Sequence, residues 1–146
     1  MKVIQGNILD VKEGIIVHQV NCRDRIGAGV AGTIIKAYPA VEDAYHKACT
    51  HYEPDKLLGR YQLVSVTPSL TVANVFGQKD YGNPRKTGQV YTDLPSLVNA
   101  IRIICGIRNQ QVYVPYGIGC GLGGASWDDL VAQVQDLDNL TAVRLK

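Results

Sequence analysis

The chain has 146 residues, of which 46% are hydrophobic and 19% charged, and its formal net charge is +2. These values exclude a disordered or low-complexity chain, and the length is that of one domain covering residues 1–146. The basic residues are scattered in short clusters such as Arg23-Asp24-Arg25 and Arg85-Lys86, so we expect no nucleic-acid partner. No apolar run is long enough to cross a bilayer, so we expect no membrane partner either.

Apolar runs rich in β-branched residues predict six strands, at residues 3–4, 14–20, 61–66, 70–76, 111–115 and 141–145. Helical periodicity predicts four helices between them, at residues 28–38, 41–51, 93–108 and 127–137. Pro39 separates the first two helices, and residues 78–90 read as a polar loop. This alternation predicts an α/β domain in which helices cover both faces of a mixed sheet.

Four cysteines are spread along the chain, without a C-x-x-C pair and without a spacing to histidines that is typical of zinc sites. We therefore expect reduced thiols and no bound metal. The chain opens directly in strand-like sequence, with no leader, and a cytoplasmic location is the expectation. The cysteines are Cys22, Cys49, Cys105 and Cys120. The oligomeric state stays open at this point.

A glycine-rich stretch, VPYGIGCGLGGASW at residues 114–127, follows the fifth predicted strand and carries five glycines. Ser126 is a plausible cap for the next helix, with Asp129 three residues further on. A helix N-terminus offers unpaired N–H groups, and bare glycine backbone lets a phosphate approach them closely. The stretch therefore predicts an anion site, and the alternative is a tight turn that is merely rich in glycine.

A second loop of this kind, residues 27–32, follows the second predicted strand, and both loops contain G-x-G-x-x-G. A dinucleotide-binding Rossmann domain would place this motif directly after its first strand and an acidic residue about twenty positions later. Neither copy complies, so a nicotinamide-dependent dehydrogenase is disfavoured. We expect the two loops to close on one diphosphate, so that glutamate at Gly29 or Gly119 would abolish binding and leave the fold largely intact.

Three segments together resemble the macro domain family, which binds ADP-ribose: residues 5–8, residues 16–22 leading to 27–31, and residues 115–122. The resemblance implies a three-layer α/β/α sandwich with a central mixed six-stranded sheet, and no cofactor. It also implies contacts to adenine, to the distal ribose and to the diphosphate. These are Asn7 and Ile8 for adenine; Asn21, Gly27, Ala28, Gly29 and Val30 for the ribose; and Ile118, Gly119, Cys120, Gly121 and Leu122 for the diphosphate.

Within the family, both glycine loops look most like the branch that removes terminal ADP-ribose and the related ADP-ribose-1″-phosphate phosphatases. This resemblance implies hydrolysis of an ADP-ribose derivative, either that phosphate or ADP-ribose attached to a macromolecule. The glycohydrolases of the branch use a lysine just after a central strand and an aspartate just after Gly-Cys-Gly-Leu. In this chain Gly123 stands where the glycohydrolases have the aspartate. Gln78 stands most nearly where they have the lysine, and Lys79 is the next residue.

The candidate catalytic residues are therefore Lys79 and Asn21, and each has a structural alternative. Lys79-Asp80 can be a solvated loop pair, and Asn21 can form an Asx turn. A water held against the distal ribose by loop donors could act without the lysine. A reader that binds ADP-ribose without chemistry is the competing class. His18 alternates with apolar neighbours, so we expect a core histidine.

Overall fold

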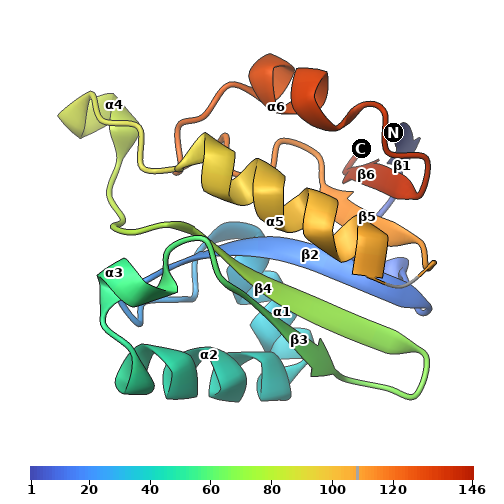
Figure 1. Ribbon diagram of the computed structural model, residues 1–146, viewed down its shortest axis with the longest axis horizontal. Helices are drawn as coiled ribbons and strands as arrows, with labels where there is room; N and C mark the ends of the chain where they lie inside the picture. The colour runs from blue at the N-terminus through green and yellow to red at the C-terminus, as the bar shows by residue number, and fades with distance from the viewer. Residues whose placement is uncertain (108) are drawn as a thin grey trace.

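Six strands form one sheet in the order β1-β6-β5-β2-β4-β3 in the computed structural model, which describes residues 1–107 and 109–146 (Figure 1). The strands are β1 (Lys2–Gln5), β2 (Gly14–Asn21), β3 (Tyr61–Ser65), β4 (Leu70–Gln78), β5 (Val112–Pro115) and β6 (Leu140–Arg144). Every neighbouring pair is parallel except β3 with β4. The carboxyl ends of five strands therefore meet at one edge of a mixed sheet, as predicted.

The centre of the sheet is β2 beside β4, and most residues of both strands are buried because helices cover both of their faces. Successive side chains of β2 enter different cores. Ile15 and Val17 lie in the cluster formed with α5 and α6, and Ile16 lies in the cluster formed with α1 and α2. A one-residue change of register would exchange these faces, so the pattern fixes the strand in place.

Helices lie on both sides of the sheet, which confirms the three-layer sandwich (Figure 1). One layer contains α1 (Gly29–Ala37), α2 (Pro39–His51) and the short α3 (Pro54–Leu57), and the other contains α5 (Leu94–Ile107) and α6 (Trp127–Val134). The 3-10 turn η1 (Ile8–Asp10) and the one-turn helix α4 (Pro84–Thr87) complete the elements. In the described part of the chain, no helix combines the length and the apolar character needed to cross a membrane.

The predicted element boundaries differ from the observed ones in a few places. Pro39 does separate α1 from α2, but it is the first residue of α2, where a proline costs no hydrogen bond. The helix predicted for 93–108 ends at Ile107 in the structure, and Arg108 lies outside the described residues. The polar loop predicted for 78–90 is wrong in part, because it contains α4 and because its first residue still belongs to β4.

Candidate functional site

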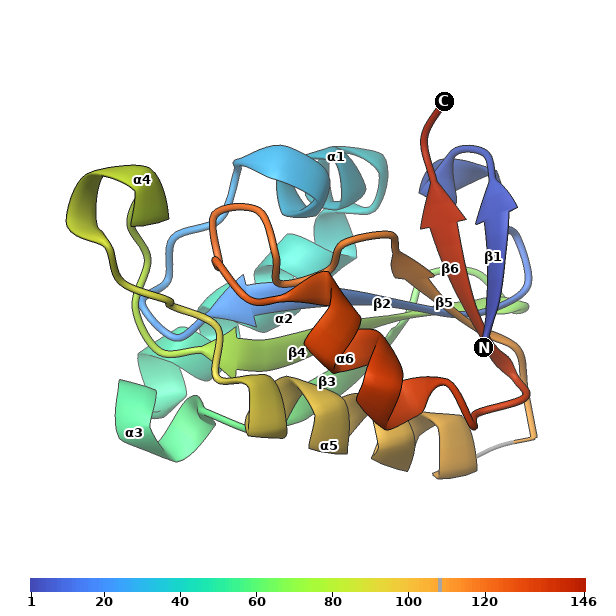
Figure 2. The same cartoon turned by 90° about the horizontal axis from the view of Figure 1, so that it is seen from above.

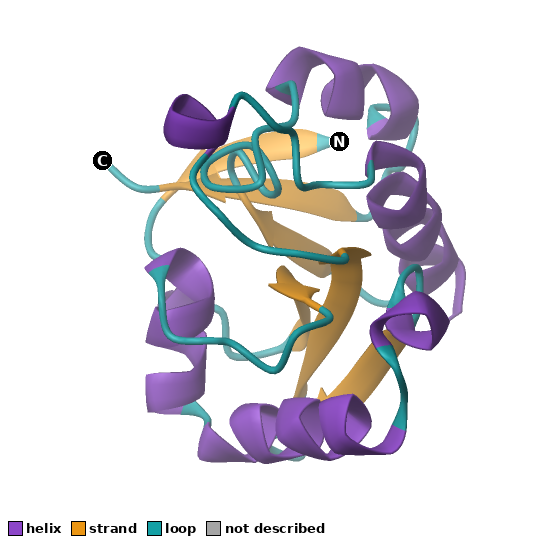
Figure 3. Ribbon diagram, turned by 90° about the vertical axis from the view of Figure 1, so that its left-hand side faces the viewer, coloured by secondary structure: helices purple, strands orange, loops and turns teal. Residues whose placement is uncertain are grey.

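The two glycine loops leave the sheet at the same edge. They follow β2 and β5, which are neighbouring parallel strands, so their carboxyl ends point the same way. Figure 2 shows the loop after β5 beside the start of α1, and Figure 3 looks onto the end of the molecule where these loops lie. In open α/β sheets this edge is where ligands bind. The two glycine loops thus leave one edge of the sheet, and their closing on one diphosphate stays a prediction.

The N-terminus of α1 has no side-chain cap, because Ala28 occupies the capping position. Among the described residues, the backbone amides of Gly29 and Val30 have no hydrogen-bond acceptor. The preceding turn needs glycine at position 27, where φ is +144°, and at position 32, where a side chain would collide with the Gly27 carbonyl. The turn thus leaves open amides at the positive end of a helix dipole, where an anion is stabilised.

The loop between β5 and α6 holds its own shape with part of its amides and leaves the others open. The Ile118 amide donates to Pro115 O at 3.0 Å, and the Cys120 amide donates to Gly117 O at 2.9 Å. The remaining amides of the predicted diphosphate contact have no acceptor within the described chain: Gly119, Gly121 and Leu122. Three of the five predicted contacts are therefore available as backbone donors.

Helix α6 begins where the sequence predicted, with Ser126 as its cap. The Asp129 amide donates to Ser126 Oγ at 3.3 Å, and two aspartates follow in the first turn. This cap occupies an amide, and the carboxylates add negative charge, so the start of α6 is a poor anion site. The open donors at this position belong to the loop itself and not, as the sequence suggested, to the helix N-terminus.

The two glycines chosen for substitution have different surroundings. At Gly29 a side chain would meet open space, although φ is +58°. At Gly119, φ is +75° and an added Cβ would lie 2.9 Å from Leu97 Cδ2 and 3.2 Å from Thr92 Oγ1. Both neighbours are buried. The expectation that glutamate at Gly119 leaves the fold intact is therefore wrong, because that position is part of the packing against α5.

Asn21 ends β2 and organises the loop that follows. Its Oδ1 accepts the Arg23 amide at 2.9 Å, which is an Asx turn, and its Nδ2 donates to Arg25 O at 2.7 Å. The buried Tyr45 hydroxyl bonds both Asn21 O and Asn21 Oδ1, and it accepts the Arg25 amide at 3.0 Å. The Asx turn is thus present, and contact with a ribose stays a prediction for this residue.

Lys79 is the first residue after β4, and its side chain turns toward α3. Its Nζ lies 2.5 Å from Asp55 Oδ1, and both side chains are partly exposed. Gln78 is occupied by its Nε2 bond to Asp80 O and by the Gln19 amide, which donates to Gln78 Oε1 at 2.7 Å. A lysine thus directly follows a central strand, whereas the glutamine is held in a side-chain network.

Position 123 has no room for a carboxylate. A side chain at Gly123 would collide with Thr92 Oγ1 and with the carbonyl of Gly119. The Gly123 carbonyl in turn accepts the backbone amides of Tyr91 at 2.8 Å and Thr92 at 2.9 Å. Glycine therefore allows the loop to close against the chain before α5, at the position where the glycohydrolase pattern has aspartate.

Asn7 and Ile8 follow β1, at the other end of the same sheet edge. Asn7 is exposed and caps η1, since its Oδ1 accepts the Leu9 amide at 2.9 Å. Ile8 is buried, and η1 packs against β5. With a strand spacing of about 4.8 Å, the three steps from β1 through β6 and β5 to β2 cover about 14 Å. The predicted contacts thus follow one another along the edge.

His18 is a core residue, as the sequence predicted. It is 1% exposed, and its Nε2 lies 2.5 Å from Asn74 Oδ1. Burial lowers the pKa of His18 to about 4, so the ring is neutral at pH 7. The Asn74 Nδ2 group donates hydrogen bonds to Gln62 Oε1 and to Val41 O. These bonds connect β2, β4 and β3 to α2. This network is structural and does not reach the glycine loops.

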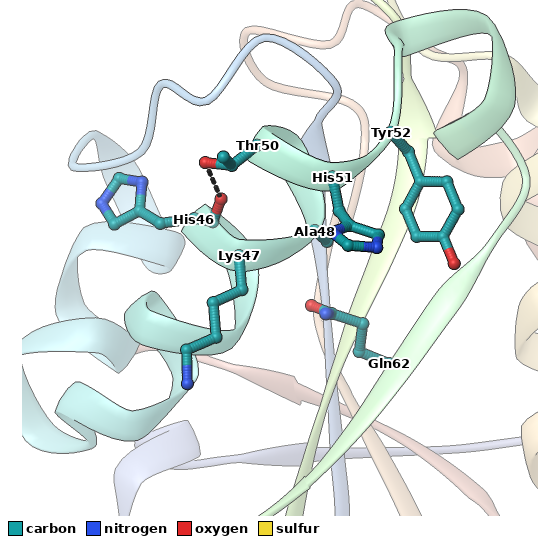
Figure 4. Close-up of a pocket in the computed structure, with 7 residues that line it drawn as sticks. All are labelled: His46, Lys47, Ala48, Thr50, His51, Tyr52 and Gln62. Carbon is teal, nitrogen blue, oxygen red and sulfur yellow. Dashed lines mark hydrogen bonds between the residues drawn. The ribbon is translucent and has the colours of Figure 1, made fainter.

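One hollow of the surface lies outside the predicted contacts, and another is lined in part by two of them. One, of about 540 Å³, lies on α2 and β3 and includes Gln62, whose amide donates to Ala44 O (Figure 4). The second, of about 570 Å³, lies beside α1 and includes Gly27, Gly29 and Lys36. Neither contains a group of metal-ligating side chains in the described residues.

Several solved structures with the same arrangement are macrodomains. No family model matches the chain. It is 32% identical over 146 residues to a DNA ADP-ribosyl glycohydrolase of Mycobacterium tuberculosis, and this match covers 94% of the chain but 40% of the relative. It is 25% identical over 134 residues to an ADP-ribose 1″-phosphate phosphatase of Candida albicans, covering 88% and 85%. The chain thus spans less than half the length of the mycobacterial relative.

A solved structure extends this likeness over both chains. The macrodomain of Mycobacterium tuberculosis DarG superposes with a TM-score of 0.70 and 27% identity, covering 99% of this chain and 95% of that one. The strand order, the helical layers and the loops at the carboxyl edge define an α/β/α domain of the macrodomain class. The chain therefore has the fold of that macrodomain and is similar to it over 99% of its own length.

Proposed function

We propose that the chain binds ADP-ribose along the carboxyl edge of the sheet and hydrolyses the bond between the distal ribose and an attached phosphate or macromolecule. The observation that carries this proposal is the set of open backbone amides in both glycine loops. Amides from two neighbouring loops suit a diphosphate, because each phosphate group can accept several N–H bonds without any basic side chain. The amides are those of Gly29, Val30, Gly119, Gly121 and Leu122.

The order of elements along the edge supports the same ligand. Adenine would lie at Asn7 after β1, the diphosphate between the loop after β5 and the start of α1, and the distal ribose against Asn21 at the end of β2. ADP-ribose carries these three parts in this order. The names of the relatives add independent support for hydrolysis, since one acts on ADP-ribosyl DNA and the other on ADP-ribose 1″-phosphate.

Lys79 is the candidate nucleophile, because β4 ends at Gln78 and a lysine directly after this strand fits the glycohydrolase pattern. Its ammonium group would leave Asp55 and give up a proton, the nitrogen would bond to C1″ of the ribose, and the displaced group would take up that proton. Water would then break the N–C1″ bond and release ADP-ribose and free lysine. The other route uses a water that the loops hold against C1″ from the start.

A reader without catalytic activity is the second candidate, and the packing at Gly123 favours it. A glycohydrolase of the proposed kind resolves its adduct with an aspartate, and this position cannot hold one without moving Thr92. A chain that keeps the binding loops and lacks the acid would bind ADP-ribose and not turn it over.

A direct assay separates the two candidates. The protein is incubated with ADP-ribose-1″-phosphate, with ADP-ribosylated protein and with an ADP-ribosylated oligonucleotide, and released phosphate and ADP-ribose are quantified. Turnover of any of the three is the expected result, and tight ADP-ribose binding without turnover would identify a reader. Thermal shifts with ADP-ribose and with NAD provide the control for binding, because a ligand at a hundred times its Kd stabilises the fold by about 2.7 kcal/mol.

We also propose a cytoplasmic location. Its support is that all four cysteines are free thiols, which is usual in a reducing compartment. Burial raises the pKa of Cys22 to about 12 and that of Cys105 to about 11, so both stay protonated and unreactive.

A further inference from the structure

Two loops that lie far apart in the sequence are joined at the carboxyl edge. They follow β2 and β4, which are parallel neighbours, and Figure 2 shows them at the same end of the molecule. The Cys22 amide donates to Lys79 O at 3.2 Å, and Arg23 Nε lies 2.6 Å from Asp80 Oδ1. The loop that contains Arg23 and Arg25 is therefore joined to the segment of Lys79 and Asp80, and α4, which carries Arg85 and Lys86, begins three residues after Tyr81.

The region formed by these segments holds a large share of the positive charge of the chain. Five cations stand against three carboxylates, which leaves two positive charges, and the whole chain has a net +2. The residues are Arg23, Arg25, Lys79, Arg85 and Lys86 against Asp24, Asp55 and Asp80. Arg85 and Lys86 are exposed on α4 and have no carboxylate partner among the described residues. A polyanion is the partner that such a charge distribution attracts.

An exposed aromatic ring lies inside this basic region. Tyr81 is 46% exposed, and the Arg25 guanidinium lies over its ring, with Cζ 5.1 Å from the ring centre. Arg25 Nη1 also donates to the Tyr81 hydroxyl at 3.1 Å. The Arg25 amide is fixed by the buried Tyr45 hydroxyl, so the pair is held by the fold. A ring with a guanidinium on it and phosphate-binding cations nearby is a platform on which a base can stack.

We propose that Arg25 and Tyr81 form a subsite for an unpaired base of a single-stranded nucleic acid, which carries the ADP-ribose that the glycine loops hold. Arg85 and Lys86 would contact the phosphates of the strand. This inference rests on the proposed function and adds the acceptor side of the substrate. A single strand is required, because a base inside a duplex is already stacked on its neighbours and cannot cover the ring. An acidic peptide would neutralise the positive charge of the region but would not stack on the Tyr81 ring.

The chain offers a matched control for Tyr81. Tyr52 is 41% exposed, and Arg60 lies over its ring with Cζ 4.8 Å from the ring centre. This second pair belongs to the α2–β3 side, where Tyr52 also borders the hollow of Figure 4. Tyr81→Ala and Tyr52→Ala therefore remove the same kind of stacked ring, and only the first removes it beside the glycine loops.

The test measures fluorescence anisotropy with an unmodified single-stranded oligonucleotide, its duplex and an acidic peptide, together with calorimetric titration of ADP-ribose. We expect Tyr81→Ala to weaken oligonucleotide binding about tenfold or more, Tyr52→Ala to change it less than twofold, and both variants to keep the ADP-ribose Kd within twofold. Replacing Arg85 and Lys86 with glutamine should flatten the salt dependence of oligonucleotide binding.

Three outcomes would overturn the subsite: equal effects of the two tyrosine variants, duplex or peptide binding as tight as single-strand binding, or loss of ADP-ribose affinity in Tyr81→Ala. Since the oligonucleotide carries no ADP-ribose, this result is independent of the nucleotide site. Failure of the parent protein to bind ADP-ribose would instead overturn the proposed function.

Discussion

The Thr92 hydroxyl donates a hydrogen bond to the backbone carbonyl of Gly119 at 2.7 Å, and this contact holds the glycine loop against the segment that enters α5. The same oxygen accepts the Gln19 amide at 2.8 Å, so the loop is also connected to the central strand β2. Because a hydrogen-bonded loop keeps its open amides in fixed directions, less entropy is lost when a phosphate binds. Thr92 is thus a positioning residue for the proposed diphosphate site.

Replacing Thr92 with valine should separate this role from simple packing. Thr92→Val keeps the shape but removes one hydrogen bond from the Gly119 carbonyl, which still accepts the Ala125 amide, and one from the Gln19 amide, which still donates to Gln78. We expect a loss of about 0.5–1.5 kcal/mol of unfolding free energy for each lost bond. We also expect ADP-ribose affinity to fall at least threefold. Thr92→Ser keeps the hydroxyl and serves as the control, with near-parental affinity. Urea unfolding and calorimetric titration measure the two effects, and equal affinity losses in both variants would contradict the role.

A charge placed at Gly121 tests the diphosphate contact without disturbing the fold. A side chain there would meet nothing within 4 Å, and its φ lies outside the left-handed region. Gly121→Glu should weaken ADP-ribose binding at least tenfold more than Gly121→Gln, or about 1.4 kcal/mol, because only the carboxylate repels the phosphates. Both variants should melt like the parent. Equal affinities of the glutamate and glutamine variants would mean that the phosphates lie elsewhere.

Lys79 tests the chemistry separately from binding. Lys79→Ala should lower turnover of the active substrate at least a hundredfold and leave the ADP-ribose Kd within threefold, since the amine acts at C1″ and not on the diphosphate. Lys79→Arg should not restore turnover, because a guanidinium stays protonated and is no nucleophile. Lys56→Ala, on the nearby α3, is the control for loss of a lysine. Parental turnover in Lys79→Ala would favour the route in which water attacks directly.

His18 predicts how stability depends on pH. Its folded pKa of about 4 lies below the ordinary value of 6.5, so the unfolded chain binds the proton more readily. Stability is therefore full above pH 6.5 and is lost as the pH falls toward 4, by roughly 3 kcal/mol over that window. Urea unfolding of the parent and of His18→Gln between pH 7.5 and 5 measures it. The parent should lose more stability than the variant, and parallel pH profiles would contradict the assignment.

The strands and the main helices could be predicted because their apolar patterns are long. The residues Ile15, Ile16 and Val17 in β2 read as a buried run, and the structure buries all three. The one-turn helix α4 could not be predicted in this way, because four residues contain too little periodicity. Its only local signals are Pro84 at its start and Asn83, which caps the Arg85 amide.

Contacts between distant segments account for what the sequence left open. Gly29 and Gly119 both belong to a G-x-G-x-x-G motif, so the sequence does not distinguish them. Only Gly119 lies against Leu97, and the two positions therefore differ in their tolerance to substitution. Arg25 and Tyr81 lie far apart along the chain, and only the pairing of β2 with β4 brings them together. Such relationships depend on strand order, which no local pattern specifies.

The central claim is that open amides of both glycine loops hold one diphosphate, and amide NMR during titration with ADP-ribose tests it most directly. The account predicts that the amide signals of Gly29, Val30, Gly121 and Leu122 shift together with a single Kd. It also predicts that adenosine, which has no phosphate, leaves them in place. Saturating ADP-ribose without a shift in either loop, or a shift in one loop alone, would contradict the account.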